Sequence, residues 1–301
     1  MKISAVVTAY NHEKYITQCL ESVLKQKGDF QLEVIVGDDC STDQTPRIIQ
    51  EFRKRYPQII QVLPVEKNLG ISKNLERCLA ACSGEYIAIC EGDDYWTDEE
   101  KLQKQKDFLE SRSDCSMCFS ALLLYYEDQN LTIPHQVQAS LQKDFVTMED
   151  LIGNNYIANL SCCMYRTEVI RKLPPSTYNL EINTDDWLIG MACSQFGSVG
   201  FLPETMSVYR IHAGGAWSGM DVFEQLDFTC RHMDVSNQFF DYKYDSLFQE
   251  RRKLFEDEIA RQRALVEAQK TNVNPDRSFL GSLFSKVRSS ITKSLHPPKS
   301  S

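Results

Sequence analysis

Short apolar runs and amphipathic segments alternate along the first hundred residues. The apolar runs, rich in β-branched side chains, predict buried strands over Ile3–Thr8, Leu32–Val36, Ile59–Leu63 and Tyr86–Cys90. Between these runs, apolar residues at three- and four-residue spacing predict helices over Tyr15–Lys25, Thr45–Tyr56 and Asn74–Ala81. This order predicts an α/β fold with a doubly wound, mostly parallel sheet that is flanked by helices.

The alternation loosens beyond residue 100. The pattern predicts a helix over Glu99–Leu109, with Lys101, Lys104 and Lys106 facing outward, and strands over Met117–Tyr126, Ser161–Tyr165 and Val208–Ile211. Residues 221–270 are strongly charged, contain no Pro or Gly, and predict helix. We therefore expect three parts: a domain over residues 1–218, a helical extension over 219–271 and a tail over 272–301.

Charge and composition exclude some classes of protein. The chain has 301 residues, and its 33 basic against 42 acidic side chains give a net charge of −9. That balance argues against a protein that grips nucleic-acid phosphates. The longest apolar run, Phe119–Tyr126, is far shorter than the ~20 residues of a membrane span. The eleven cysteines lie singly in apolar or helical stretches, which is typical of reduced thiols in a cytoplasmic protein.

Acidic residues gather where two predicted strands end. Glu91-Gly92-Asp93-Asp94 follows the strand Tyr86–Cys90, and three carboxylates so close together repel one another unless a cation lies between them. Mg²⁺ or Mn²⁺, with phosphate oxygens completing the shell, would supply that charge; the alternative is a solvated acidic turn that caps the next helix. Asp38-Asp39 follows the strand Leu32–Val36, where an acid can accept from a ribose hydroxyl or a base.

Three segments together carry a family pattern: Val6-Val7-Thr8-Ala9-Tyr10-Asn11, then the stretch from Val34 to Asp43, then the stretch from Gly84 to Trp96. They resemble the family 2 glycosyltransferases of GT-A fold, which are inverting enzymes that use nucleotide-diphosphate sugars. The resemblance covers about residues 1–215. It implies transfer of a sugar, with a UDP-sugar as the expected donor, to a hydroxyl acceptor in bacterial-type glycan or polysaccharide synthesis.

The resemblance also implies roles for single residues. It assigns the nucleotide-sugar to Thr8, Ala9, Tyr10 and Asn11, with Asp39 on the base. It assigns a divalent metal, Mn²⁺ or Mg²⁺, to Glu91, Asp93 and Asp94, with Asp93 also near the ribose or sugar. Lys73 stands near the place of the family's Arg-Asn pair and is a candidate for the phosphates.

Two later elements complete the implied site. In Thr184-Asp185-Asp186-Trp187-Leu188, the second acid takes the place of the family's general base, and inversion by single displacement requires a carboxylate that removes the acceptor's proton. Asp185 reads as a helix cap. In Tyr209-Arg210-Ile211-His212, Arg210 is expected to meet phosphate oxygens, and His212 either binds the metal or a phosphate or is a structural histidine.

Rival functions and the partners remain open at this point. A sugar-1-phosphate nucleotidyltransferase would need a Gly-rich, basic loop after the first strand, which here reads Thr8-Ala9-Tyr10-Asn11-His12. A lectin-like, non-catalytic homologue would not need Asp186. The acceptor can be a glycan, a lipid-linked glycan or a protein. Apolar residues spaced for one helix face over 279–295, among basic residues, predict either peripheral contact with the inner face of a membrane or a helix packed on the domain.

Overall fold

The computed structural model describes residues 1–178, 182 and 185–272. The chain divides into two compact units, residues 1–212 and residues 213–301. The expected three-part division at residues 218 and 271 stays a prediction. The amphipathic stretch expected over 279–295 lies outside the described residues.

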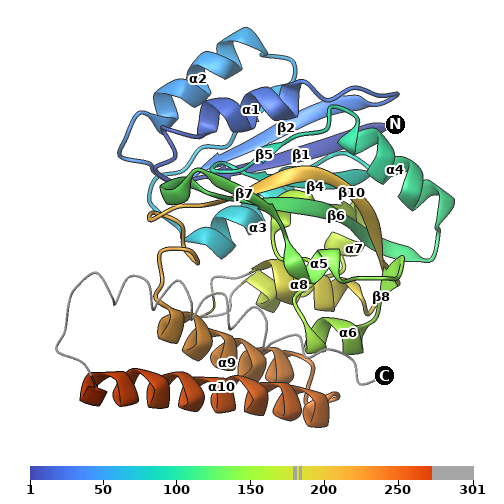
Figure 1. The fold of residues 1–301 in the computed structure, drawn as a ribbon. Helices are drawn as coiled ribbons and strands as arrows, with labels where there is room; N and C mark the ends of the chain where they lie inside the picture. Colours follow the sequence, from blue (N-terminus) through green and yellow to red (C-terminus); the bar gives the residue numbers. More distant parts are fainter. Residues whose placement is uncertain (179–181, 183–184, 273–301) are drawn as a thin grey trace. The chain divides into compact units, whose positions relative to one another are not determined.

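The amino-terminal half of the first unit is a parallel sheet with helices on both faces (Figure 1). Its elements are β1 (Lys2–Ala9), α1 (Ile16–Leu24), β2 (Gln31–Asp38), α2 (Thr45–Arg55), β3 (Ile60–Val62), α3 (Ile71–Ala81) and β4 (Tyr86–Glu91). The strands lie in the order β3-β2-β1-β4. Thr8 of β1 pairs with Gly37 on one side and with Glu91 on the other, so the loops after these three strands start at one edge of the sheet.

The second half of this unit extends the sheet with mixed strand directions. Its strands are β5 (Tyr95–Trp96), β6 (Cys115–Tyr126), β7 (Leu131–Pro134), β8 (Phe145–Val146), β9 (Cys163–Arg166) and β10 (Ser198–Ile211). Strand β9 runs antiparallel to both of its neighbours, β4 and β6, and β10 runs parallel to β6. The α/β fold with a mostly parallel sheet is therefore confirmed, and the parallel half carries the acidic loops.

Further helices connect these strands. They are α4 (Lys101–Ser111), η1 (Glu127–Gln129), α5 (Gln136–Ala139), α6 (Met148–Gly153), η2 (Leu160–Cys162), α7 (Thr167–Ile170), η3 (Pro175–Tyr178) and α8 (Asp185–Cys193). Of these, η2 and α8 bear on the site, because η2 leads directly into β9 and Asp186 lies in the first turn of α8.

The prediction that Lys101 faces outward is wrong. Its side chain is fully buried, donates to Oε1 of Gln105 at 2.6 Å, and places its ammonium 4.6 Å from the centre of the Trp96 ring. Burial lowers the pKa of Lys101. A helical pattern identifies the apolar face, but it does not show that β9 and β5 also enclose the edge of that face.

The cysteines agree with their expected place in the interior. All eleven are free thiols; ten are buried and Cys40 is half-buried. Burial raises the pKa of Cys78 and Cys82 to about 12, so these thiols stay protonated at neutral pH. They pack as small apolar side chains.

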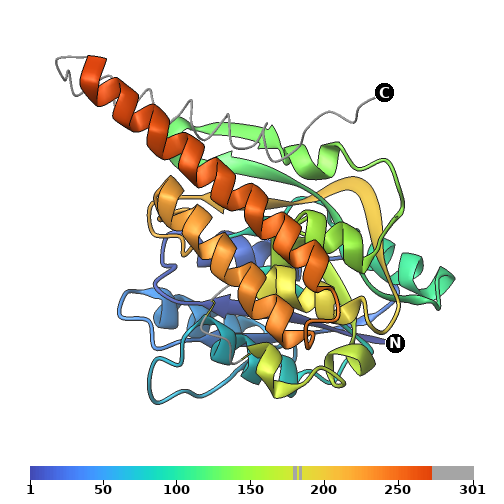
Figure 2. The ribbon, with the colours of Figure 1, turned by 90° about the horizontal axis from the view of Figure 1, so that it is seen from below.

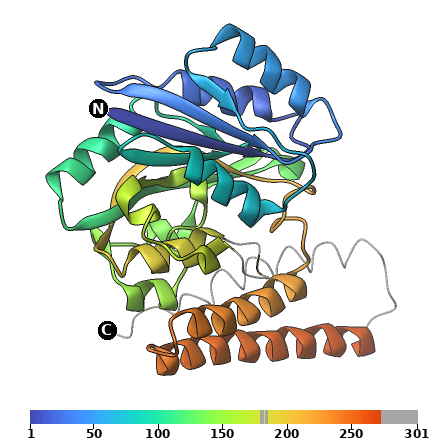
Figure 3. The ribbon, with the colours of Figure 1, turned by 180° about the vertical axis from the view of Figure 1, so that it is seen from behind.

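The second unit is a helical hairpin (Figure 2). Helix α9 (Val222–Phe239) begins at a capping box in which the Asp221 carboxylate accepts from the N–H of Glu224. The turn after it places Asp241 and Tyr242 at φ of 49° and 59°, and α10 (Asp245–Asn272) then runs back along α9 (Figure 3). Among the described residues, no helix is both long and apolar enough to cross a membrane.

Candidate active site

The acidic turn, residues 91–94, lies where β4 ends. The N–H of Gly92 donates to the carbonyl of Thr8 at 2.8 Å, which ties the turn to the end of β1. A Cβ atom at Gly92 would come 2.7 Å from that carbonyl oxygen and 2.8 Å from Nδ1 of His12. Only glycine fits so close an approach, so the turn is packed against the loop after β1.

Asp93 lies between two imidazoles. Its Oδ2 is 3.1 Å from Nε2 of His212, at the end of β10, and 3.6 Å from Nε2 of His12, in the loop after β1. Burial by itself would raise the pKa of Asp93, but the two histidines lower it. Three segments that are far apart in the sequence therefore converge on one carboxylate, and 18% of that side chain is exposed.

The other two acids of the turn face protein donors. Asp94 is 1% exposed, and its carboxylate accepts from the hydroxyl of Ser161 at 2.7 Å and the N–H of Arg210 at 2.9 Å. Burial, followed by the charge of Asp93, raises the pKa of Asp94 to about 8. Oε2 of Glu91 accepts from the side-chain amide of Asn159 at 2.8 Å. The assignment of Glu91 and Asp94 to a metal stays a prediction, and Asp93 has the more open carboxylate.

Arg210 holds the acidic turn in place. Its Nε donates to the carbonyl of Asp93 at 2.8 Å, and its Nη2 donates to Oε1 of Gln18 at 2.8 Å. The rings of three tyrosines surround the guanidinium, with centres 4.8 to 5.5 Å from it: Tyr15, Tyr95 and Tyr125. With 7% of the residue exposed, this guanidinium is engaged by protein groups. Its expected contact with phosphate oxygens stays a prediction.

Asp39 holds the loop that precedes α3 by hydrogen bonds at the same edge of the sheet. Its two carboxylate oxygens accept from the N–H groups of Leu69 and Gly70, both at 2.8 Å, and its side chain is buried. Thr8 and Ala9 form the end of β1, and Tyr10, which follows them, is 47% exposed. The expected contacts of Thr8, Ala9, Tyr10 and Asp39 with the nucleotide-sugar stay predictions.

Asn11 and Lys73 already have protein partners. Asn11 adopts φ of 58°, and its Oδ1 accepts from the N–H of Thr42 at 2.8 Å, which joins the loops after β1 and β2. Lys73 lies in the first turn of α3 and forms an ion pair with Glu76 at 2.9 Å on the helix surface. Their expected contacts with the substrate stay predictions.

Asp186 lies in the first turn of α8. Its Oδ2 accepts from the side-chain amide of Asn155 at 2.9 Å, and burial raises its pKa although that hydrogen bond opposes the shift. Tyr209 of β10 lies near both this carboxylate and the acidic turn. Burial and then the charges of the nearby acids raise the pKa of Tyr209; these acids are Asp94, Glu91, Asp93 and Asp186. The structure thus brings the expected base and the acidic turn to one place.

The sequence pattern did not single out some residues of this site. They are His12, Asn155, Asn159, Ser161 and Arg77, whose Nη2 donates to the carbonyl of Asp38 at 2.9 Å. His12 had a signal, since it lies in the loop that follows a strand of the expected binding edge. The other four had none, because amide, hydroxyl and guanidinium groups occur throughout the chain.

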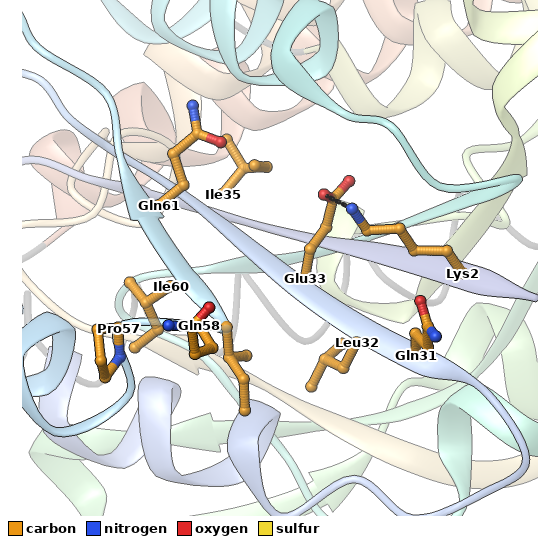
Figure 4. A pocket seen from close by; sticks show the side chains of 10 residues that line it. Lys2, Gln31, Leu32, Glu33, Ile35, Pro57, Gln58, Ile60 and Gln61 are labelled. Carbon is orange, nitrogen blue, oxygen red and sulfur yellow. Dashed lines mark ion pairs between the residues drawn. The ribbon is translucent and has the colours of Figure 1, made fainter.

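A hollow elsewhere on the sheet is unrelated to these acids. It lies near the amino ends of β1 and β2 and beside the edge strand β3, and the ion pair of Lys2 with Glu33 lines it (Figure 4). Parallel strands of α/β sheets bind ligands at their carboxyl ends, which is the opposite end of these strands. We therefore place the candidate site at the acidic turn.

Residues 4–173 match the pattern of the family described as glycosyl transferase family 2. This match spans more than half of the chain. The chain belongs to glycosyl transferase family 2. This membership agrees with the position of the acids at the carboxyl edge of the sheet.

Relatives with curated sequences support the membership. An uncharacterized protein of Mycobacterium tuberculosis is 37% identical over 217 residues, which are 71% of this chain and 60% of that protein. The poly(ribitol-phosphate) beta-N-acetylglucosaminyltransferase TarS of Staphylococcus aureus is 34% identical over 177 residues, 57% of this chain and 28% of TarS. The chain therefore spans 60% or less of the length of these two relatives.

Solved structures show the same fold. The structure of S. aureus TarS 1–349 in complex with UDP-GlcNAc has a TM-score of 0.59 at 23% identity and covers 78% of this chain and 66% of that one. The mannosyltransferase PcManGT from Pyrobaculum calidifontis, in complex with GDP-Man and Mn²⁺, has a TM-score of 0.66 at 16% identity and covers 98% of this chain and 84% of that one.

Proposed function

We propose that this family 2 member is an inverting glycosyltransferase that moves one sugar from a nucleotide-diphosphate donor to a hydroxyl acceptor. The observation that carries the proposal is that residues 155–161 donate hydrogen bonds both to Asp186 and to the acidic turn. A general base on one side of the donor and groups that hold the diphosphate on the other are what a single displacement needs.

A UDP-sugar is the donor that we favour. The TarS relative is named for transfer of N-acetylglucosamine, and its structure holds UDP-GlcNAc. The more distant mannosyltransferase holds GDP-Man, so a GDP-sugar is the second candidate. On this proposal Thr8, Ala9, Tyr10 and Asn11 lie along the nucleoside, and Asp39 meets the base. The acceptor would be a glycan, a lipid-linked glycan or a protein, in bacterial-type glycan synthesis in the cytoplasm.

Among the described residues, no three His, Cys, Asp or Glu side chains are placed to hold a metal ion by themselves, so on this proposal phosphate oxygens of the donor would complete the shell of a divalent metal at Asp93. A carboxylate flanked by two imidazoles is a donor set that suits Mn²⁺ better than Mg²⁺, which prefers oxygen ligands. Asp93 and His212 would hold the ion, with His12 beside them; Glu91 and Asp94 would support the turn. The metal, when bound, neutralises charge that develops on the leaving diphosphate.

The protein's own groups would perform the rest of the reaction. The Asp186 carboxylate removes the proton of the acceptor hydroxyl as that oxygen attacks the anomeric carbon. Asn155 orients the carboxylate by donating to Oδ2, which directs the other oxygen toward the acceptor. Attack from the face opposite the nucleotide inverts the configuration at the anomeric carbon.

Release of the nucleoside diphosphate tests this function. Purified protein with Mn²⁺ is incubated with UDP-, GDP- and dTDP-sugars, and release of the diphosphate is measured with and without candidate acceptors. We expect release from one class of donor, accelerated by an acceptor. Release of pyrophosphate from a nucleoside triphosphate and a sugar-1-phosphate would instead indicate a nucleotidyltransferase. Donor binding without turnover under any condition would indicate a lectin-like protein.

A further inference from the structure

One short segment contacts three of the acids at the candidate site. Residues 155–161 connect α6 to β9 through η2, and we name them the bracket segment. Asn155 donates to Asp186 at 2.9 Å, Asn159 donates to Glu91 at 2.8 Å, and Ser161 donates to Asp94 at 2.7 Å. The expected base lies on α8, and the acidic turn lies at the end of β4. The side chains that donate to them belong to one continuous stretch of backbone, residues 155–161.

Several hydrogen bonds hold the carboxyl-terminal part of the bracket segment, which contains Asn159 and Ser161. The Ser161 hydroxyl also accepts from the N–H of Glu91 at 2.9 Å, so one oxygen contacts both ends of the acidic turn. Oδ1 of Asn159 accepts from the N–H of Ser161 at 2.6 Å, and Nε1 of Trp96 donates to the Ser161 carbonyl at 2.8 Å. Ser161 is fully buried and Asn159 is 5% exposed. These side chains have few other conformations available.

The amino-terminal part of the bracket segment contains a backbone conformation that non-glycine residues rarely adopt. Ala158 has φ of 66°, and its N–H donates to Oδ1 of Asn155 at 3.0 Å. Asn155 therefore uses its acceptor to close the loop and its donor to hold Asp186. A left-handed alanine is strained, and such strain gathers at functional sites.

We propose that the bracket segment positions the general base relative to the metal-side acids, with Asn155, Asn159 and Ser161 as positioning residues. This inference rests on the proposed function, since it explains how that site keeps its geometry. A shift of the segment moves Asp186 and the acidic turn together, which preserves the distance between the base and the leaving group. None of the three residues needs to contact the substrate.

The first test removes the hydrogen bond from Asn155 to Asp186 and keeps the hydrogen bond that Asn155 accepts from the N–H of Ala158. Asn155→Asp keeps an oxygen for the N–H of Ala158 but replaces the donor to Asp186 with a like charge. We expect the acidic limb of the kcat–pH profile to move up by about one pH unit or more, while the donor KM changes little. Tyr209 and the acids of the turn, Glu91, Asp93 and Asp94, are unchanged in this variant. Asn154→Asp, which adds the same charge one residue earlier, is the control and should leave the limb in place.

The second test addresses the acidic turn. We expect Ser161→Ala and Asn159→Ala to weaken binding of Mn²⁺ with UDP by about 10- to 100-fold in calorimetry. Ser116 is an equally buried serine whose hydroxyl donates to the Gly197 carbonyl, so Ser116→Ala is the matched control and should keep wild-type affinity. Ser161→Thr keeps the hydroxyl and should recover part of the affinity.

The outcomes distinguish the two proposals. If the wild type binds Mn²⁺ with UDP or GDP and transfers a sugar, but the Asn155, Asn159 and Ser161 variants match their controls, the bracket segment has no positioning role. If the wild type neither binds a nucleoside diphosphate nor releases one, the proposed function fails. Loss of Mn²⁺–UDP affinity in Ser161→Ala that exceeds the loss in Ser116→Ala, measured where both variants are folded, supports the inference.

Discussion

Nε2 of His212 lies 3.1 Å from Oδ2 of Asp93, across 119 residues of sequence. The contact joins the end of β10 to the acidic turn after β4. On the proposed function, this imidazole and carboxylate would hold the metal ion next to the diphosphate. The behaviour of this pair is the most direct probe of the site.

Substitution of Asp93 should remove the metal dependence. Asp93→Asn keeps the size of the side chain but loses the anionic oxygen that Mn²⁺ prefers. We expect no detectable Mn²⁺-dependent binding of UDP in calorimetry and no turnover. Asp107→Asn, at an exposed residue of α4, is the control. Chelator-insensitive activity of the wild type would contradict the metal proposal.

Asp94 should matter for folding as well as for activity. Asp94→Ala leaves the buried Ser161 hydroxyl and the N–H of Arg210 without their acceptor. Each such loss costs about 1–3 kcal/mol, so we expect a lower free energy of unfolding in denaturant titrations together with loss of turnover. Unchanged stability with lost metal binding would instead make Asp94 a ligand, as the sequence alone suggested.

The base is tested by an isosteric change. Asp186→Asn cannot take a proton, so we expect kcat to fall by about 10²–10⁴-fold while donor KM changes little. Asp186→Glu keeps a carboxylate and should retain more activity than Asp186→Asn. Near-normal kcat in Asp186→Asn would show that another residue is the base, and Asp185 would be tested next.

The helical hairpin should lose stability in acid because of His232. This side chain is 1% exposed, and burial lowers its pKa to about 3 from 6.5. Since the unfolded chain binds the proton more readily, the contribution is complete above pH 6.5 and declines as the pH falls toward 3, by roughly 1.4 kcal/mol per unit. His232→Leu should flatten the pH dependence of the unfolding free energy between pH 6 and 4. Equal slopes for the two proteins would refute this assignment.

Binding of the tail to membranes is a separate prediction. Residues 276–301 contain five basic residues against one acidic residue, and their apolar residues recur at helical spacing. We expect the 301-residue chain to sediment with anionic liposomes and a chain that ends at Pro275 to remain in the supernatant. Neutral liposomes are the control. Equal partitioning of the two chains would show that the tail is not an anchor.

The sequence by itself determined the parallel half of the sheet and the place of its chemistry. The strands Lys2–Ala9, Gln31–Asp38 and Tyr86–Glu91 are buried on both faces, so continuous apolar runs mark them, and the acids that follow mark the binding edge. The family pattern lies in these same local stretches. It pointed to Asp39, the acidic turn and Asp186 before any contact between them was visible.

Only the tertiary structure decided which carboxylate is open and which is buried. Asp93 and Asp94 are neighbours in sequence, yet one faces two histidines and the other faces Ser161 and the backbone of Arg210. Their difference depends on β9 pairing between β4 and β6, which brings residues 155–161 under the turn. Pairing between distant strands leaves no local pattern, because the partners of each hydrogen bond are set by register and not by neighbouring residues.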